Sequence, residues 1–189
     1  MAQANGRKLD AKLNQGLNQP PPNCIRVLLE ITVDKDARIP NPCFKSDGQR
    51  FSMATTTLKL LHEGMYNFTL VLSPQEVVQR LELVNRGSGL TEPVELALSE
   101  GKKDDTHGIT TYITTWKCNL DWNLKNTRHE LELYIHVEGF GTLVLPIQLK
   151  VYSPGDKSLT LGTRLRYFQY LFKRTSDEIK MISMSPFSL

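Results

Sequence analysis

The sequence predicts a single all-β domain, an antiparallel sandwich or barrel. Apolar and polar residues alternate with a period of two, most clearly from Leu131 to Val137. Candidate strands of this kind follow one another at spacings of about eight to twelve residues, with Gly, Pro, Asn and Asp between them. At 189 residues, the chain has room for one sizeable core and two tails.

The expected strands begin after a polar amino-terminal segment. Residues 1–22 are rich in Gln, Asn, Gly and Lys and end in three prolines, so we expect a flexible tail there. The domain is expected over residues 23–175, and a flexible carboxyl-terminal tail over residues 176–189. Within the domain the expected strands are 24–33, the two arms of a hairpin that turns at Asp47-Gly48, 56–61, 65–72, 77–84, 93–99, 108–118, 129–137, 142–152 and 163–173.

The last two strands carry features that bear on their place in the sheet. Pro146 lacks a backbone donor, so strand 142–152 is expected at an edge or with a bulge at that residue. In segment 161–174, helical spacing would align Leu161, Leu165, Phe168 and Phe172 on one side. The aromatic content of this segment favours a strand instead.

Composition narrows the class of protein. The 23 basic and 20 acidic residues are interspersed and leave a net charge of +3, which does not favour a nucleic-acid binder. No apolar run approaches the roughly 20 residues that span a bilayer, and the amino terminus lacks the apolar core of a secretion signal, so we expect a cytoplasmic protein. The odd count of three cysteines argues against a disulfide framework and agrees with a reducing compartment.

We expect no enzyme, no cofactor and no metal site. The four histidines are scattered, without a cysteine or second histidine at metal-ligand spacing, and no nucleophile elbow, phosphate loop or dinucleotide motif is present. Two acidic pairs, Asp34 with Asp36 and Asp104 with Asp105, leave calcium-dependent membrane binding as an alternative. Lysines stand among these carboxylates, which disfavours a calcium site.

Residues 44–74 combine the hairpin with a series of further motifs. The run DGQRF is followed by a threonine-led strand with LKLL, a Gly-Met-Tyr turn, and an amphipathic strand that ends in Ser73-Pro74. This series resembles the cannabinoid receptor-interacting protein family. Weaker matches continue through GFGT at 139–142, QLKVY at 148–152 and RYFQY at 166–170, whereas the extension through residue 22 and the tail after Thr175 do not align.

The resemblance implies a fold and a function. The implied fold is the immunoglobulin-like β-sandwich of the Rho GDP-dissociation inhibitor. The implied function is that of a non-enzymatic cytosolic adaptor, which binds the intracellular tail of a G-protein-coupled receptor of the cannabinoid type and modulates its signalling. Such a protein would work in the cytoplasm, and would reach the inner face of the plasma membrane through its partner, as a peripheral protein at most.

Two sets of candidate site residues follow. For the adaptor, the expected partner-binding residues lie around the hairpin and on the last strand: Lys45, Asp47, Gln49, Arg50, Arg164 and Arg166. The alternative function is a carrier of lipidated protein cargo, prenylated or acylated, in an apolar cavity between the sheets. Its candidate lining residues are Leu58, Phe68, Leu70, Leu133 and Ile135, which would otherwise form ordinary core.

Overall fold

The computed structural model describes residues 19–34, 39–46, 56–86, 92–121, 128–176 and 178–188. These residues form strands, turns and one short 3-10 helix, and no α-helix occurs among them. The all-β prediction is therefore confirmed. The expected turn at Asp47-Gly48 lies outside the described residues.

The strands range from two residues in β6 to twelve in β10 and β11. Their bounds are β1 (Cys24–Val33), β2 (Cys43–Ser46), β3 (Thr56–Leu61), β4 (Met65–Ser73), β5 (Val78–Asn85), β6 (Val94–Glu95), β7 (Lys102–Asp104), β8 (Ile109–Lys117), β9 (His129–Val137), β10 (Gly141–Tyr152), β11 (Thr163–Arg174) and β12 (Ile179–Ser188). The 3-10 helix η1 (Lys157–Thr160) lies between β10 and β11.

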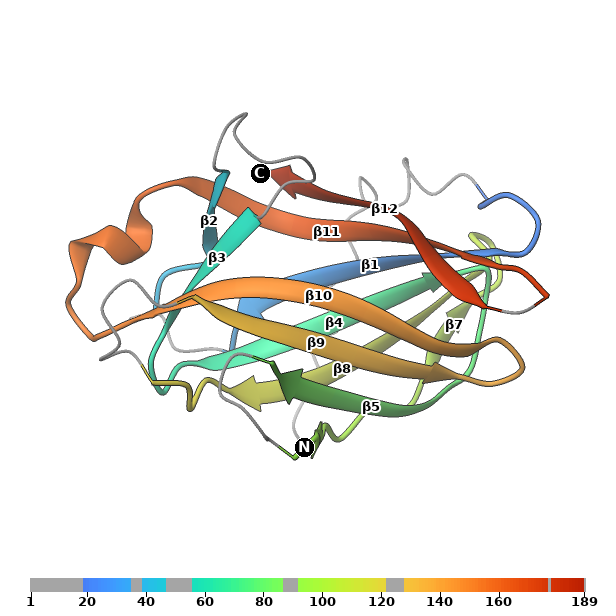
Figure 1. Ribbon diagram of the computed structural model, residues 1–189, viewed down its shortest axis with the longest axis horizontal. Coiled ribbons are helices and arrows are strands. Elements are labelled where there is room, and N and C mark those ends of the chain that lie inside the picture. The colour runs from blue at the N-terminus through green and yellow to red at the C-terminus, as the bar shows by residue number, and fades with distance from the viewer. Residues whose placement is uncertain are drawn as a thin grey trace, which may run out of the picture.

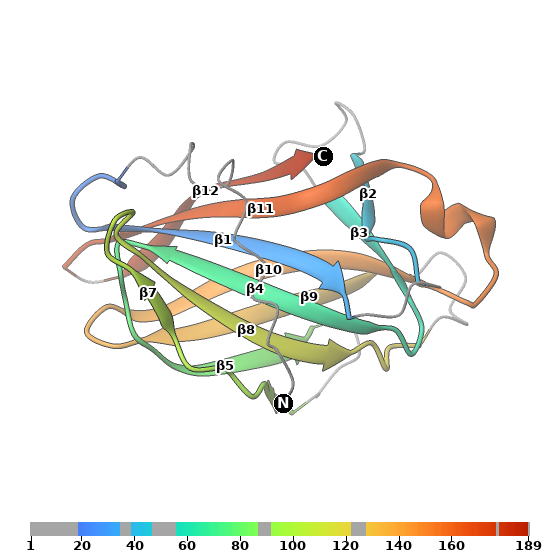
Figure 2. The same ribbon diagram turned by 180° about the vertical axis from the view of Figure 1, so that it is seen from behind.

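The strands pair into one curled sheet. Its order is β6-β5-β9-β10-β3-β2-β11-β1-β4-β8-β7, and β12 pairs with β11 beside this path. Figure 1 shows β10, β9 and β5 in one layer and β1, β4 and β8 in a second layer behind them; Figure 2 shows the same layers from the other side. β11 joins the two halves, because residues 168–173 pair with β1 while Thr163 and Arg164 pair with β2.

One pairing is parallel, so the prediction of a purely antiparallel sheet is wrong. Thr57 of β3 lies opposite Gln148 of β10, and the two strands run in the same direction. Alternation along a strand shows which residues share a face, but it carries no information on the direction of a neighbouring strand. Six strands separate β3 from β10 in the chain, so no hairpin turn sets their relative direction.

Inward-facing side chains of both layers meet in one core. Ile25, Val27 and Leu29 of β1 are fully buried, and so are Leu133 and Ile135 of β9 in the other layer. Each such side chain contributes roughly 1.5–3 kcal/mol through burial. The alternation predicted for residues 129–137 is confirmed from Glu130 to Val137, because the apolar residues there are buried and the polar ones are more exposed; His129, at the start of β9, is buried as well.

Segment 163–173 is a strand, as its aromatic content predicts. Phe168, Tyr170 and Phe172 of β11 point inward and are at most 2% exposed. A register shift against β12 falls between Leu165 and Tyr167. This irregularity interrupts the alternation and explains why a helical spacing could be found in the same segment.

Among the described residues, Pro146 lies where β10 is paired on one side only. β9 pairs with β10 from Gly141 to Leu149, without a register shift at Pro146. On the other side, β3 pairs with β10 only from Gln148 onward. The Pro146 carbonyl accepts a hydrogen bond from the Tyr170 hydroxyl at 3.1 Å, so the backbone polar groups of this residue face away from β9. The absence of an N–H group at Pro146 therefore removes no hydrogen bond to β9.

The end of the chain differs from the expected tail. Residues 179–188 form β12, which pairs antiparallel with β11 along most of its length. Ile179 and Met184 pack against the core, whereas most other β12 side chains are exposed. The run IKMISMSPFS has little regular alternation, which is why its pattern gave no strand.

Candidate functional site

Four basic residues gather on the outer face of the sheet, on four neighbouring strands. Arg164 of β11 lies opposite Cys43 of β2, Cys43 lies opposite Lys59 of β3, and Lys59 lies opposite Lys150 of β10. Lys45 shares the outer face of β2 with Cys43. Because paired strands are only about 4.8 Å apart, these side chains form one surface. We call Lys45, Lys59, Lys150 and Arg164 the basic cluster.

Lys59 is the fixed centre of the basic cluster. Its ammonium group donates hydrogen bonds to the carbonyl of Ser158 at 2.7 Å and to that of Leu161 at 2.5 Å, so it holds the η1 turn against β3. The residue is only 7% exposed. Its Nζ and that of Lys150 lie 5.6 and 5.4 Å from the centre of the Tyr152 ring, within the range of cation–π attraction.

The electrostatics of the cluster favour an anionic ligand. Burial is the main cause that lowers the pKa of Lys59; the charges of Lys45 and Lys150 lower it further, whereas Cys43 and Asp156 act in the opposite direction. Asp156 is near Lys59 and Lys150, but its carboxylate accepts the Ser158 N–H at 2.8 Å and caps η1. Within the described ranges, no carboxylate forms an ion pair with the cluster. An acidic partner would relieve this repulsion.

The structure brings together part of the predicted partner-binding set. Lys45 and Arg164 are both exposed and lie on neighbouring strands, although they are far apart in the sequence. Arg166 lies beyond them, at the register shift of β11, where its guanidinium is 5.7 Å from the centre of the Tyr167 ring. The remaining predicted residues, Asp47, Gln49 and Arg50, lie outside the described residues.

Sequence reasoning missed Lys59 and Lys150 as site residues. Both stand among alternating apolar residues, where a lysine looks like an ordinary solvent-facing position. The available signal was a repeated pattern, because each follows a polar residue by two positions: Thr57 before Lys59 and Gln148 before Lys150. Their adjacency depends on the parallel register, which the pattern does not reveal.

The five residues proposed to line a lipid cavity are part of the packed core. They are at most 1% exposed and belong to one continuous cluster of buried residues: Leu58, Phe68, Leu70, Leu133 and Ile135. The structure gives the lipid-carrier alternative no support.

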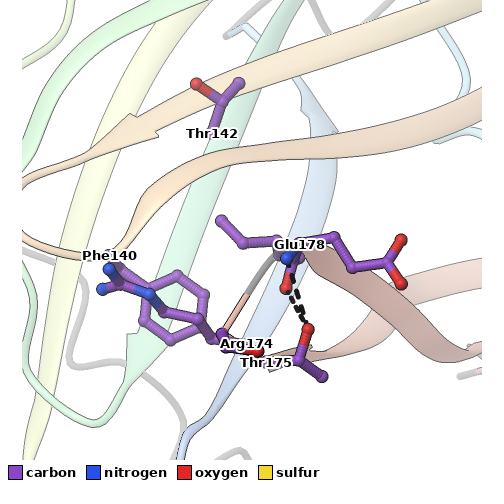
Figure 3. A pocket seen from close by; sticks show the side chains of 7 residues that line it. Phe140, Thr142, Arg174, Thr175 and Glu178 are labelled. Carbon is purple, nitrogen blue, oxygen red and sulfur yellow. Dashed lines mark hydrogen bonds between the residues drawn. The ribbon is translucent and has the colours of Figure 1, made fainter.

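A surface hollow of about 380 Å³ lies at the turns that follow β9 and β11. Figure 3 shows Arg174 against the ring of Phe140, and Thr175 hydrogen-bonded to Glu178. The Arg174 guanidinium also donates to the carbonyl of Gly139 and is 5.9 Å from the centre of the Phe140 ring. These contacts tie the two turns together at the start of β10 and β12.

The described part of the chain contains no candidate metal site. It contains no group of three or more His, Cys, Asp or Glu side chains that could hold a metal ion. The three cysteines are buried and free, and burial raises the pKa of the Cys118 thiol to about 11. Among the described residues, no helix is long and apolar enough to cross a membrane.

The described residues form an all-β domain with a cluster of cations on its outer face. The chain belongs to the CB1 cannabinoid receptor-interacting protein 1 family, whose model matches residues 22–185. The resemblance carried by residues 44–74 is therefore confirmed, and the match extends into β12, beyond the part that the motifs aligned. The family is named for an interaction with a receptor and not for a catalysed reaction. No match is found among the curated proteins.

Proposed function

We propose that this protein is a non-enzymatic cytosolic adaptor that binds the intracellular tail of a cannabinoid-type receptor and modulates its signalling. The family match supports a receptor as the partner. The single structural observation that carries the proposal is the basic cluster, in which four cations have no ion-pair partner among the described residues. We infer that an acidic part of the receptor tail supplies the missing negative charge.

The cluster is suited to binding because its centre is already ordered. Lys59 is 7% exposed and is held by two carbonyl groups, so it supplies a fixed positive charge just below the surface. Lys45, two positions after Cys43 on β2, and Arg164, opposite Cys43 on β11, are both exposed and can adapt to the partner. The immunoglobulin-like sandwich of the Rho GDP-dissociation inhibitor, which the resemblance implies, stays a prediction.

The test is a calorimetric titration with overlapping peptides from the intracellular tail of a CB1 cannabinoid receptor. We expect one segment to bind, and the variant Lys45→Glu with Arg164→Glu to weaken its binding by about tenfold or more, because two attractive charges become repulsive. The matched control is Lys102→Glu with Lys103→Glu, which makes the same charge change on exposed positions of β7 in the other half of the sheet.

Three results would argue against the proposal. If no tail peptide binds, the receptor tail is not the partner. If the cluster variant and the β7 control lose the same affinity, only the net charge matters and the cluster is not the site. If neither variant loses affinity, binding does not depend on these charges at all.

A further inference from the structure

β10 has one backbone edge that is only partly occupied. β9 covers one side of β10 from Gly141 to Leu149. On the opposite side, β3 covers only Gln148 to Tyr152. Among the residues that the structure describes, no strand pairs with residues 141–147 on that side. We call this stretch the open edge of β10.

Two backbone N–H groups point out of the open edge. Pro146 accepts from the Tyr170 side chain, and Tyr152 accepts from the N–H of His62, so the even-numbered residues of β10 face away from β9. The N–H and C=O of a residue in an antiparallel ladder point to the same side. Thr142 and Val144 therefore present their N–H and C=O groups at the open edge, while Pro146 has no N–H to offer.

β12 approaches the open edge at one end only. Ile179 packs over Gly141, where an added Cβ would lie 2.7 Å from the Ile179 Cδ1. From this contact β12 runs along β11 and diverges from β10, as Figures 1 and 2 both show. The hollow in Figure 3 lies where the two strands meet.

The other end of the open edge leads into the basic cluster. From Gln148 onward, β3 pairs with this side of β10. The Thr57 hydroxyl donates a hydrogen bond to the Gln148 side chain at 2.6 Å. Lys45 lies opposite Thr57, and Lys150 follows Gln148 by one step on the same face. A segment that paired with Thr142 and Val144 would reach the cations of the cluster only by continuing past Pro146, whose carbonyl the Tyr170 hydroxyl already occupies.

We propose that the open edge of β10 binds an extended acidic segment of the partner by strand addition, through hydrogen bonds to Thr142 and Val144. Strand addition supplies affinity through main-chain hydrogen bonds and needs an unpaired sheet edge. The continuity of the open edge with the basic cluster selects an acidic extended chain as its occupant. This inference rests on the proposed function and adds the mode of binding.

The test is amide hydrogen exchange, measured by NMR on the full chain with and without the receptor-tail peptide that binds in calorimetry. In the free protein, we expect the N–H groups of Thr142 and Val144 to exchange rapidly. We expect those of Leu143 and Leu145, which point toward β9, to exchange slowly. Saturating peptide should slow exchange at Thr142 and Val144 by about tenfold or more and leave Leu143 and Leu145 unchanged.

A pair of variants tests the same backbone group. Val144→Pro should weaken peptide binding by about tenfold because it removes a donor from the open edge, and it breaks no bond to β9, as at Pro146. Val144→Thr keeps the donor and should bind as tightly as the parent chain. Should Val144→Pro fail to fold, the exchange experiment decides alone.

The outcomes separate the two proposals. A peptide that binds without slowing exchange at Thr142 and Val144 overturns strand addition and leaves the proposed function standing. If no peptide binds, both fail. Slow exchange at these two amides in the free protein would mean that the edge is already occupied. If that protection increased with protein concentration, a second copy of the chain would be the occupant, and strand addition by the partner would be wrong.

Discussion

Tyr66 shows how one side chain closes a turn against the core. Its hydroxyl oxygen accepts the backbone N–H of Leu61 at 2.8 Å, across the turn that joins β3 to β4. The residue is 1% exposed, and burial raises the pKa of its hydroxyl to about 12. The turn leaves no room for a side chain at Gly64, where a Cβ would lie 2.8 Å from the Tyr66 ring.

The raised pKa of Tyr66 predicts a loss of stability at alkaline pH. The ordinary tyrosine pKa of 10.0 applies to the unfolded chain, so above pH 10 only the unfolded state readily releases the proton. The stabilisation is complete below pH 10 and is lost as the pH rises through about 12; over the whole window it amounts to roughly 3 kcal/mol. Tyr66→Phe should therefore be less stable than the parent chain at pH 8, by about 1 kcal/mol for the lost hydrogen bond, and the gap should narrow by pH 11.

Urea denaturation at both pH values measures this difference. Tyr167→Phe is the control, because Tyr167 lies on the outer face of β11 against Phe187. If Tyr66→Phe and Tyr167→Phe changed the pH dependence equally, the titration of Tyr66 would not be the cause.

Individual residues were only partly predictable. Lys45 and Arg164 were identified from local signals, namely a hairpin arm and a run of basic and aromatic residues. Lys59 could not be recognised in the same way, because its role depends on the carbonyl groups of Ser158 and Leu161, which lie about a hundred positions further along the chain. A contact of this length leaves no pattern in a single sequence.

At the scale of elements, Gly162 holds the junction between β11 and β2. Its φ is +133°, a conformation that side-chain-bearing residues rarely adopt, and a Cβ there would lie 2.6 Å from the carbonyl oxygen of Phe44. Gly162→Ala should therefore destabilise the fold more than Gly155→Ala. Gly155 also has a positive φ, of +85°, but its Cβ position is open, so its substitution costs about 1–3 kcal/mol of backbone strain alone.

Thermal denaturation compares the two alanine variants. Both positions have a positive φ, but only Gly162→Ala also places a Cβ against the Phe44 carbonyl oxygen. Equal unfolding midpoints for Gly162→Ala and Gly155→Ala would show that the junction between β11 and β2 can shift to accept the Cβ without a loss of stability.

β12 contributes to stability through a small number of side chains. Met184 packs against the core, whereas Met181, on the same strand, is 37% exposed. Met184→Ala should lower the free energy of unfolding by about 1–2 kcal/mol, which is less than for a fully buried methionine. Met181→Ala should change it by less than about 0.5 kcal/mol. Chemical denaturation of both variants checks this, and equal losses would mean that β12 does not pack as described.

Strands were predictable where one face is buried and the other is exposed to solvent. The regular alternation in β9 and the aromatic content of β11 both led to correct strands. β12 was missed, because most of its side chains are exposed on both faces and alternation is lost. β7 is absent from the expected strands, because its three polar residues show no alternation and the strand is held by its pairing with β8.

At the scale of the whole molecule, the charge of one surface is expected to control binding. The net charge of the chain is only +3, yet four cations lie together on β2, β3, β10 and β11. Salt shortens the range of their attraction, since the Debye length falls from about 30 Å at 0.01 M to about 8 Å at 0.15 M. The affinity for a receptor-tail peptide should therefore fall several-fold over this range.

Calorimetry at the two salt concentrations checks this prediction. The Lys45→Glu, Arg164→Glu variant should show a weaker dependence on salt than the parent chain. An affinity of the parent chain that does not change with salt would exclude an electrostatic role for the cluster.

The overall arrangement was the least predictable level. The all-β class follows from the spacing of the strands, but the curl of the sheet depends on the parallel pairing of β3 with β10 and on the place of β11 between β1 and β2. Such pairings are decided by the packing of the whole core, which alternation within one strand does not specify.

The place of β11 also has a consequence for synthesis. β1 leaves the ribosome early, but one of its two neighbours, β11, follows only after β2 to β10 have been made. Until then, β1 presents an unpaired backbone edge and apolar side chains to other chains. Pairings that are so distant in sequence also form slowly. We therefore expect the nascent chain to be most prone to aggregation just before β11 emerges, and the sheet to close only after β11 has been made.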